Sequence, residues 1–211
     1  MTRLTRRRAG SSALRIGVRE LVRACGLVLT GTGAGWLTLS FLTGPTAWVG
    51  AGATLALLAA AWSRLDRARD FRRGGDGERR VGRRLAALER RGWIVAHDVR
   101  KPTGGNVDHL VASPGGRVYT IETKLNRFGR PELAQARRHA QWAARRLRVP
   151  ATPILCVANG RARPRMYAGV WCVGAARVVG FLTGLDRSLE GGSGSGPRGW
   201  RRRRRIRRRL G

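Results

Sequence analysis

The sequence contains very little lysine, few acidic residues and only three cysteines. Of its 211 residues, 43 are Lys or Arg and 12 are Asp or Glu, which gives a formal net charge of +31. This balance excludes an acidic disordered chain. The cysteines Cys25, Cys156 and Cys172 have no C-x-x-C spacing, which argues against a disulfide framework or a zinc knuckle. Only Lys101 and Lys124 are lysines, so these two positions stand out in a chain that otherwise uses arginine.

Charge is absent from residues 24–63. As one helix, this stretch would be about 60 Å long, roughly twice the thickness of a bilayer's hydrocarbon core. A turn-forming cluster, Thr-Gly-Pro-Thr at 43–46, divides it. The sequence therefore predicts a transmembrane helical hairpin with spans at 24–42 and 47–62, and Gly31-x-x-x-Gly35 is typical of close helix packing. The alternatives are a hairpin lying in the membrane interface and, less favoured, a signal peptide.

Basic segments flank this neutral stretch. Residues 1–23 carry a net charge of +6 and the juxtamembrane linker at 64–73 carries +3. Since basic flanks stay on the cytoplasmic side, we expect a two-span protein of the cell membrane with both termini in the cytoplasm.

Residues 74–190 show the alternating pattern of a compact α/β domain. A helix is predicted from Asp76 as N-cap to about Arg91, with Gly92 at its C-terminal end. Its apolar stripe is Val81, Leu85 and Leu88, and the same spacing places Glu78 on the face turned toward the sheet. The simpler interpretation of Glu78 is a carboxylate that stabilises the first helical turn.

Three strands are predicted at 93–99, 107–112 and 117–123, and Ser-Pro-Gly-Gly at 113–116 joins the last two as a hairpin. If the turn is centred on Gly115, Asp108 lies opposite Glu122, and Lys124 points to the same face as Glu122. A bulge in the turn would shift this register by one residue. Further strands are predicted at 153–159 and 169–173, with a closing helix at 177–185.

Two carboxylates at such a separation can share a divalent cation. Asp108, Glu122 and the backbone carbonyl of Thr123 would form part of the oxygen shell that Mg²⁺ or Mn²⁺ takes. Lys124 could orient a metal-bound water or stabilise charge on a phosphate. The alternative is a structural ion pair on a sheet face.

The ordered set of motifs Gly77-Glu78, Asn106-Val107-Asp108-His109, Ile121-Glu122-Thr123-Lys124 and Gln135-Ala136-Arg137-Arg138-His139-Ala140 resembles the nuclease-related domain (NERD), a branch of the PD-(D/E)XK nuclease superfamily. The resemblance covers about residues 75–185. It implies a restriction-endonuclease-like αβββαβ core, a mixed sheet flanked by helices. In the family, Glu78, Asp108, Glu122 and Lys124 correspond to the metal and catalytic centre, and Gln135 assists from the next helix.

A helix is predicted from Pro131 to about Arg148. Its core stripe leaves Gln135, Arg138, Trp142 and Arg145 on the other side, so the role of Gln135 rests on the resemblance. Arginines beside an exposed indole can hold phosphates and stack on bases, and we expect Arg138, Trp142 and Arg145 to bind nucleic acid. A plain solvated helix face is the alternative.

Residues 191–211 combine a Gly/Ser-rich linker with an arginine-rich tail, for which disorder is expected. Such a tail binds phosphates of nucleic acid or of anionic lipid. The sequence thus predicts a membrane-anchored, Mg²⁺- or Mn²⁺-dependent nuclease acting on nucleic acid, DNA before RNA. The alternative is a non-catalytic module that keeps the fold and binds nucleic acid or anionic lipid.

Overall fold

The computed structural model describes residues 8–41, 43–190 and 204–208. The chain forms two compact units. One comprises Ser12–Arg73, and the other comprises Gly74–Gly211 together with the N-terminal residues up to Ser11.

The first unit is built from helix α1 (Ser11–Phe41) and the first part of helix α2 (Pro45–Glu89). The helices break between Phe41 and Pro45, where the turn-forming cluster predicts a break. Both are long and apolar enough to cross a membrane, which is compatible with membrane anchoring. Their large apolar side chains are largely exposed, among them Leu29, Trp36, Leu39, Trp48, Val49, Leu55 and Trp62. Such extensive apolar exposure is typical of surfaces that contact lipid or another protein.

Small residues allow α1 and α2 to approach closely within this unit. A Cβ atom added to Gly31 would lie 3.3 Å from Cβ of Leu57, and one added to Gly50 would overlap the side chain of Thr38. These contacts agree with the prediction that the glycines serve helix packing. Near the open end of the hairpin, Glu20 accepts a hydrogen bond from Arg64 at 2.9 Å.

Helix α2 corrects one prediction from the sequence. The expected helix start at Asp76 is wrong, because α2 continues without interruption from Pro45 to Glu89 and includes the segment 64–73. Asp76 does not cap a new helix but forms an ion pair with Arg79 one turn later. Asp66 forms a similar pair with Arg69 at 3.2 Å, and pairs at this spacing stabilise a helix. The predicted end is confirmed, since Gly92 adopts a φ of 77° beyond the last turn.

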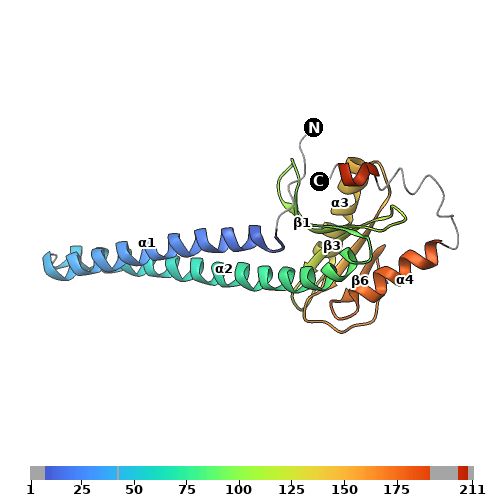
Figure 1. Ribbon diagram of the computed structural model, residues 1–211. Coiled ribbons are helices and arrows are strands. Elements are labelled where there is room, and N and C mark those ends of the chain that lie inside the picture. The colour runs from blue at the N-terminus through green and yellow to red at the C-terminus, as the bar shows by residue number, and fades with distance from the viewer. Residues whose placement is uncertain (1–7, 42, 191–203, 209–211) are drawn as a thin grey trace. The chain divides into compact units, whose positions relative to one another are not determined.

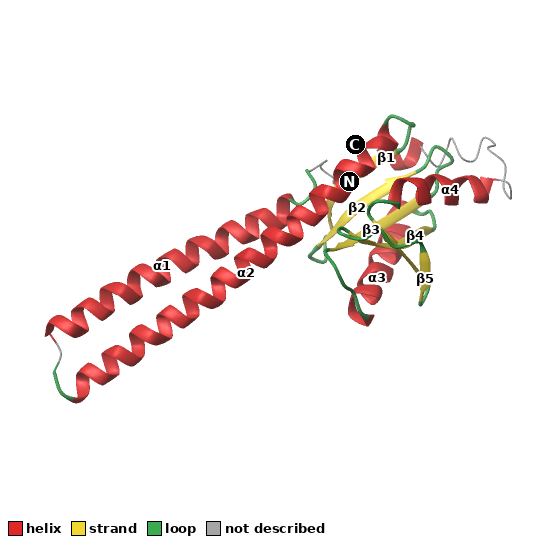
Figure 2. Ribbon diagram, turned by 90° about the horizontal axis from the view of Figure 1, so that it is seen from below, coloured by secondary structure: helices red, strands yellow, loops and turns green. Residues whose placement is uncertain are grey.

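The second unit is an α/β domain with a mixed six-stranded sheet in the order β1-β2-β3-β4-β6-β5 (Figure 1). Helix α3 covers one face, and α4 with the end of α2 covers the other (Figure 2). The predicted αβββαβ core is confirmed, with β5 as an additional short strand. The remaining elements are β1 (Ile94–Arg100), β2 (Asn106–Ala112), β3 (Val118–Lys124), α3 (Arg130–Leu147), β4 (Ala151–Val157), β5 (Arg165–Tyr167), β6 (Val170–Gly174) and α4 (Val178–Glu190).

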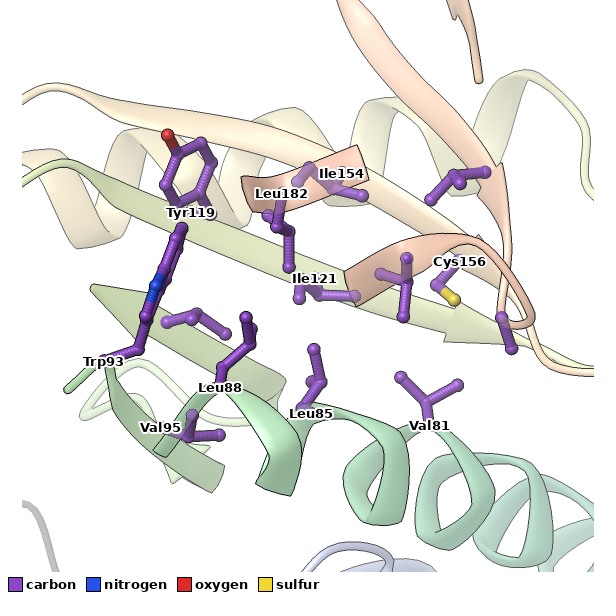
Figure 3. Close-up of a cluster of buried hydrophobic side chains, with 14 of the residues drawn as sticks. Val81, Leu85, Leu88, Trp93, Val95, Tyr119, Ile121, Ile154, Cys156 and Leu182 are labelled. Carbon is purple, nitrogen blue, oxygen red and sulfur yellow. The ribbon is translucent and has the colours of Figure 1, made fainter. Parts of the chain in front are cut away.

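The main hydrophobic core lies between α2, α4 and the sheet (Figure 3). The predicted stripe of Val81, Leu85 and Leu88 is fully buried. It packs against residues of β3 and β4 such as Ile121 and Ile154. This packing fixes the rotation of α2 about its axis, so Glu78, one turn before Val81, faces the sheet.

A second core lies between α3 and the opposite face of the sheet, and it includes part of the C-terminal tail. The expectation of a disordered tail is wrong for residues 204–208, which are helical, and Ile206 among them is 0% exposed. Ile206 packs with residues of β1, β2 and α3. The predicted Gly/Ser linker lies outside the described residues.

We predict that Leu85→Ala lowers the free energy of unfolding of the second unit by about 2–5 kcal/mol, because it leaves a cavity in the main core. The exposed Met166 provides the control, and Met166→Ala is expected to change stability by less than about 0.5 kcal/mol. Hydrogen exchange of the β3 amides in the detergent-solubilised chain measures both values. Equal protection in the two variants would contradict this description of the core.

Candidate active site

The geometry of the site follows from the β2–β3 hairpin. The turn closes with a hydrogen bond from the Gly116 N–H to the Ser113 carbonyl, 2.9 Å. The strands then pair without a bulge, with His109 opposite Ile121 and Ala112 opposite Val118. In every pair the residue numbers sum to 230, as the sequence predicts. The ladder ends at His109 and Ile121, so Asp108 and Glu122 lie directly beside its last pair, one on each strand.

The Asp108 carboxylate is anchored to the neighbouring strand. Its Oδ2 atom accepts a hydrogen bond from the Thr123 N–H at 2.7 Å. Burial is the main cause that raises the pKa of Asp108 well above its usual range, and the charges of Glu122 and Glu78 raise it further. Holding Asp108 ionised thus requires a positive charge nearby.

Glu122 lies at the centre of the cluster and is 3% exposed. Its Oε1 atom is 3.1 Å from Lys124 Nζ, and its Oε2 atom is 3.0 Å from Nδ1 of His139 on α3. The contact with His139 is close, yet neither Oε2 nor Nδ1 has a partner in hydrogen-bond geometry among the described residues. The two groups are therefore close neighbours without a formed hydrogen bond. Oε2 of Glu122 is a buried acceptor available for another ligand.

Lys124 is held between β3 and α3. Its Nζ atom lies 3.1 Å from Glu122 and 3.5 Å from Oε1 of Gln135. Gln135 thus lies beside the lysine, as the family resemblance implies. Helical projection alone placed Gln135 off the core stripe of α3. The same helical face carries His139 one turn later, which the sequence analysis did not single out as a site residue. Its spacing of four from Gln135 was the available signal.

Glu78 approaches the cluster from α2. Its pKa is raised to about 7, first by burial and then by the charges of Asp98 and Glu122. The N–H of Gly10 donates a hydrogen bond to this carboxyl group, which partly opposes the rise. Asp98, a second residue missed from the sequence, is buried with a φ of 51° and accepts a hydrogen bond from Asn106 at 2.6 Å.

The predicted nucleic-acid-binding residues do not form one exposed group. Arg138 and Arg145 are exposed on α3, whereas Trp142 is half-buried and packs against the second core. Only part of the expected exposed indole is therefore accessible. Helix α3 lies close enough to the sheet for the large ring to be covered on one side.

The negative charge of this cluster suits a divalent cation, although few side chains are available to coordinate one. Three carboxylates lie near one another, and two of them have raised pKa values that a cation would lower. Within residues 8–41, 43–190 and 204–208, no three His, Cys, Asp or Glu side chains are arranged to hold an ion by themselves. Backbone and water oxygens would have to complete the shell, as is usual for Mg²⁺.

Carboxylates and a lysine that meet at one end of the β2–β3 hairpin of an α/β domain are the arrangement that the resemblance to the nuclease-related domain implies. Residues 73–158 match the family model of the nuclease-related domain, NERD. The predicted family is thereby confirmed for residues 73–158, which run from the last part of α2 to the residue after β4. Nuclease-related domains are generally dependent on divalent metal. Among curated proteins, none matches this chain.

The raised pKa of Glu78 predicts a pH dependence of stability in the metal-free protein. A carboxyl group whose pKa is higher in the folded than in the unfolded state stabilises the folded protein most at pH values below its unfolded pKa of about 4. This contribution to the free energy of unfolding is lost as the pH rises through the folded pKa of about 7. Between pH 5 and 8 in EDTA, we expect the free energy of unfolding to fall. Glu78→Gln should reduce that fall by about 2 kcal/mol, measured by urea denaturation.

Glu89→Gln, at an exposed position on the same helix, is the matched control and should follow the wild type. A Glu78→Gln protein with the same loss of stability as the wild type would show that repulsion within the cluster is not the cause.

Proposed function

We propose that this protein is a membrane-anchored, metal-dependent nuclease that hydrolyses phosphodiester bonds, with DNA as its substrate. The observation that supports this most is the meeting of Asp108, Glu122 and Lys124 at one end of the β2–β3 hairpin. A buried ion pair alone would not bring further carboxylates to the same place. The family match over residues 73–158 points to the same chemistry.

Asp108, Glu122 and the Thr123 backbone carbonyl would hold Mg²⁺ or Mn²⁺. When bound, such an ion makes a water molecule more acidic and neutralises charge on the scissile phosphate. The protein's own contribution is to hold these oxygens on two paired strands, where their positions are fixed before substrate arrives. Glu78 completes the acidic cluster from the side of α2.

Lys124 would act on the phosphate or on the attacking water. Its ammonium group is a compact donor of three hydrogen bonds, and Glu122 and Gln135 restrain it from two sides. A group restrained in this way can stabilise negative charge as it develops on the phosphate oxygens. Gln135 is then a positioning residue for Lys124. Arg138 and Arg145 would contact the backbone of the nucleic acid, with the exposed edge of Trp142 between them.

The hairpin of α1 and α2 would anchor this activity to the cell membrane. Two spans, at 24–42 and 47–62, keep the basic segments on the same side, so both termini and the nuclease-related domain would face the cytoplasm.

A second candidate function is a non-catalytic module that binds nucleic acid through the same fold. It is favoured by one observation, the lack of three convergent ligand side chains in the described part of the chain. This candidate predicts binding of DNA that neither EDTA nor loss of Lys124 abolishes.

The test of catalysis is Lys124→Ala in the full detergent-solubilised chain. Circular single- and double-stranded DNA are incubated with Mg²⁺, Mn²⁺ or EDTA. We expect metal-dependent cutting by the wild type and a loss of at least about 100-fold in the variant, because charge on the phosphate is no longer stabilised.

Lys101→Ala is the matched control, since Lys101 is the other lysine of the chain and lies in the turn between β1 and β2. It should cut as the wild type does. Full activity of Lys124→Ala would contradict the proposed role of Lys124, and wild-type protein that binds DNA without cutting it would favour the second candidate.

A further inference from the structure

The arginine-rich tail contains a single apolar residue where it contacts the domain. Residues 201–209 are all arginine except Ile206. This side chain is fully buried in the second core, together with Val107 of β2 and with Ala143 and Leu147 of α3. Figure 1 shows the short helix that carries it, drawn in red, next to α3. Burying an isoleucine side chain contributes about 1.5–3 kcal/mol toward holding this segment in place.

The place where Ile206 docks is on the same side of the sheet as the candidate active site. Val107, which packs in this core, directly precedes Asp108. On α3, Gln135 and His139 contact the site, and Ala143 continues the same helical face into the core around Ile206. Ala143 follows Gln135 by eight residues, which corresponds to about 12 Å along α3.

The docked segment presents positive charge. Arg204, Arg205, Arg207 and Arg208 are exposed on either side of the buried Ile206. Helix α3 adds exposed arginines such as Arg138 and Arg145, while its single acidic residue, Glu132, is engaged by the Gly129 N–H at 2.7 Å. The surface around the docked segment is therefore strongly basic, with little acidic charge to balance it.

We propose that residues 204–208 are a built-in nucleic-acid clamp, which Ile206 fixes to the domain so that the flanking arginines hold the phosphate backbone beside the active site. This inference rests on the proposed function and adds the element that binds substrate. Nucleic acid is favoured over lipid because the only apolar residue of the segment points into the protein. A tail that binds a bilayer would instead insert its apolar residue into the lipid.

The test uses the full chain in neutral detergent and a fluorescent 30-nucleotide DNA, with binding followed by anisotropy in EDTA so that no cutting occurs. Ile206→Gln keeps every arginine but removes the anchor, and we expect its affinity for DNA to fall about tenfold. Ile206→Val keeps an apolar anchor and should bind within about twofold of the wild type. Wild-type affinity of Ile206→Gln would overturn the proposal.

A second variant keeps the test valid if Ile206→Gln misfolds. This variant keeps Ile206 and replaces the four flanking arginines by Gln, namely Arg204, Arg205, Arg207 and Arg208. It should bind DNA more weakly, and the slope of log affinity against log salt concentration should fall by up to about 4. An unchanged slope would overturn the clamp. The clamp would also be overturned if both variants bind DNA normally and lose binding to anionic vesicles. That result would assign the segment to lipid.

The two proposals fail in different ways. If the wild type cuts DNA and the clamp variants bind it normally, only the clamp is wrong. If the wild type neither binds nor cuts DNA, the proposed function is wrong as well.

Discussion

The mutual repulsion of buried carboxylates is the constraint on which the site depends. Asp108, Glu122 and Glu78 come from two strands and a helix. Besides burial, the charges of Glu122 and Glu78 disfavour the ionised form of Asp108, and the charge of Glu122 disfavours the ionised form of Glu78. Lys124 supplies one positive charge, which cannot balance three acids. Such an arrangement is unfavourable for folding alone, and binding of a cation and a phosphate, as proposed above, would offset this cost because their charges complement the cluster and the lysine. The rest of the domain holds these groups together against their repulsion.

Much of this could be predicted from the sequence, because the determining features are local. The Pro-Gly-Gly turn sets the hairpin register, and this register brings Asp108 and Glu122 to the same end of the two strands. Likewise, the spacing of Val81, Leu85 and Leu88 fixes the face of α2 and hence the direction of Glu78. The contact of Gln135 with Lys124 could be expected only from the family resemblance, since helical projection does not describe how far α3 rotates over the sheet.

Other features depend on contacts between distant parts of the chain, which periodicity does not reveal. The helix of residues 64–75 continues because ion pairs between neighbouring turns support it and no proline interrupts it, although Asp76 looks like a cap. Ile206 is one apolar residue among arginines, and only the pocket between α3 and the sheet makes it a core residue. Trp142 and His139 are covered for the same reason, namely the close approach of α3 to the sheet.

The central claim is that the cluster around Asp108 and Glu122 is a divalent cation site. Titration of the full detergent-solubilised chain with Mn²⁺, followed by the loss of the free-ion electron paramagnetic resonance signal, measures this without any nucleic acid. We expect a bound ion in the wild type and in Lys101→Ala, and its loss in Glu122→Gln. Equal binding by Glu122→Gln, or no binding by the wild type at millimolar Mn²⁺, would contradict it.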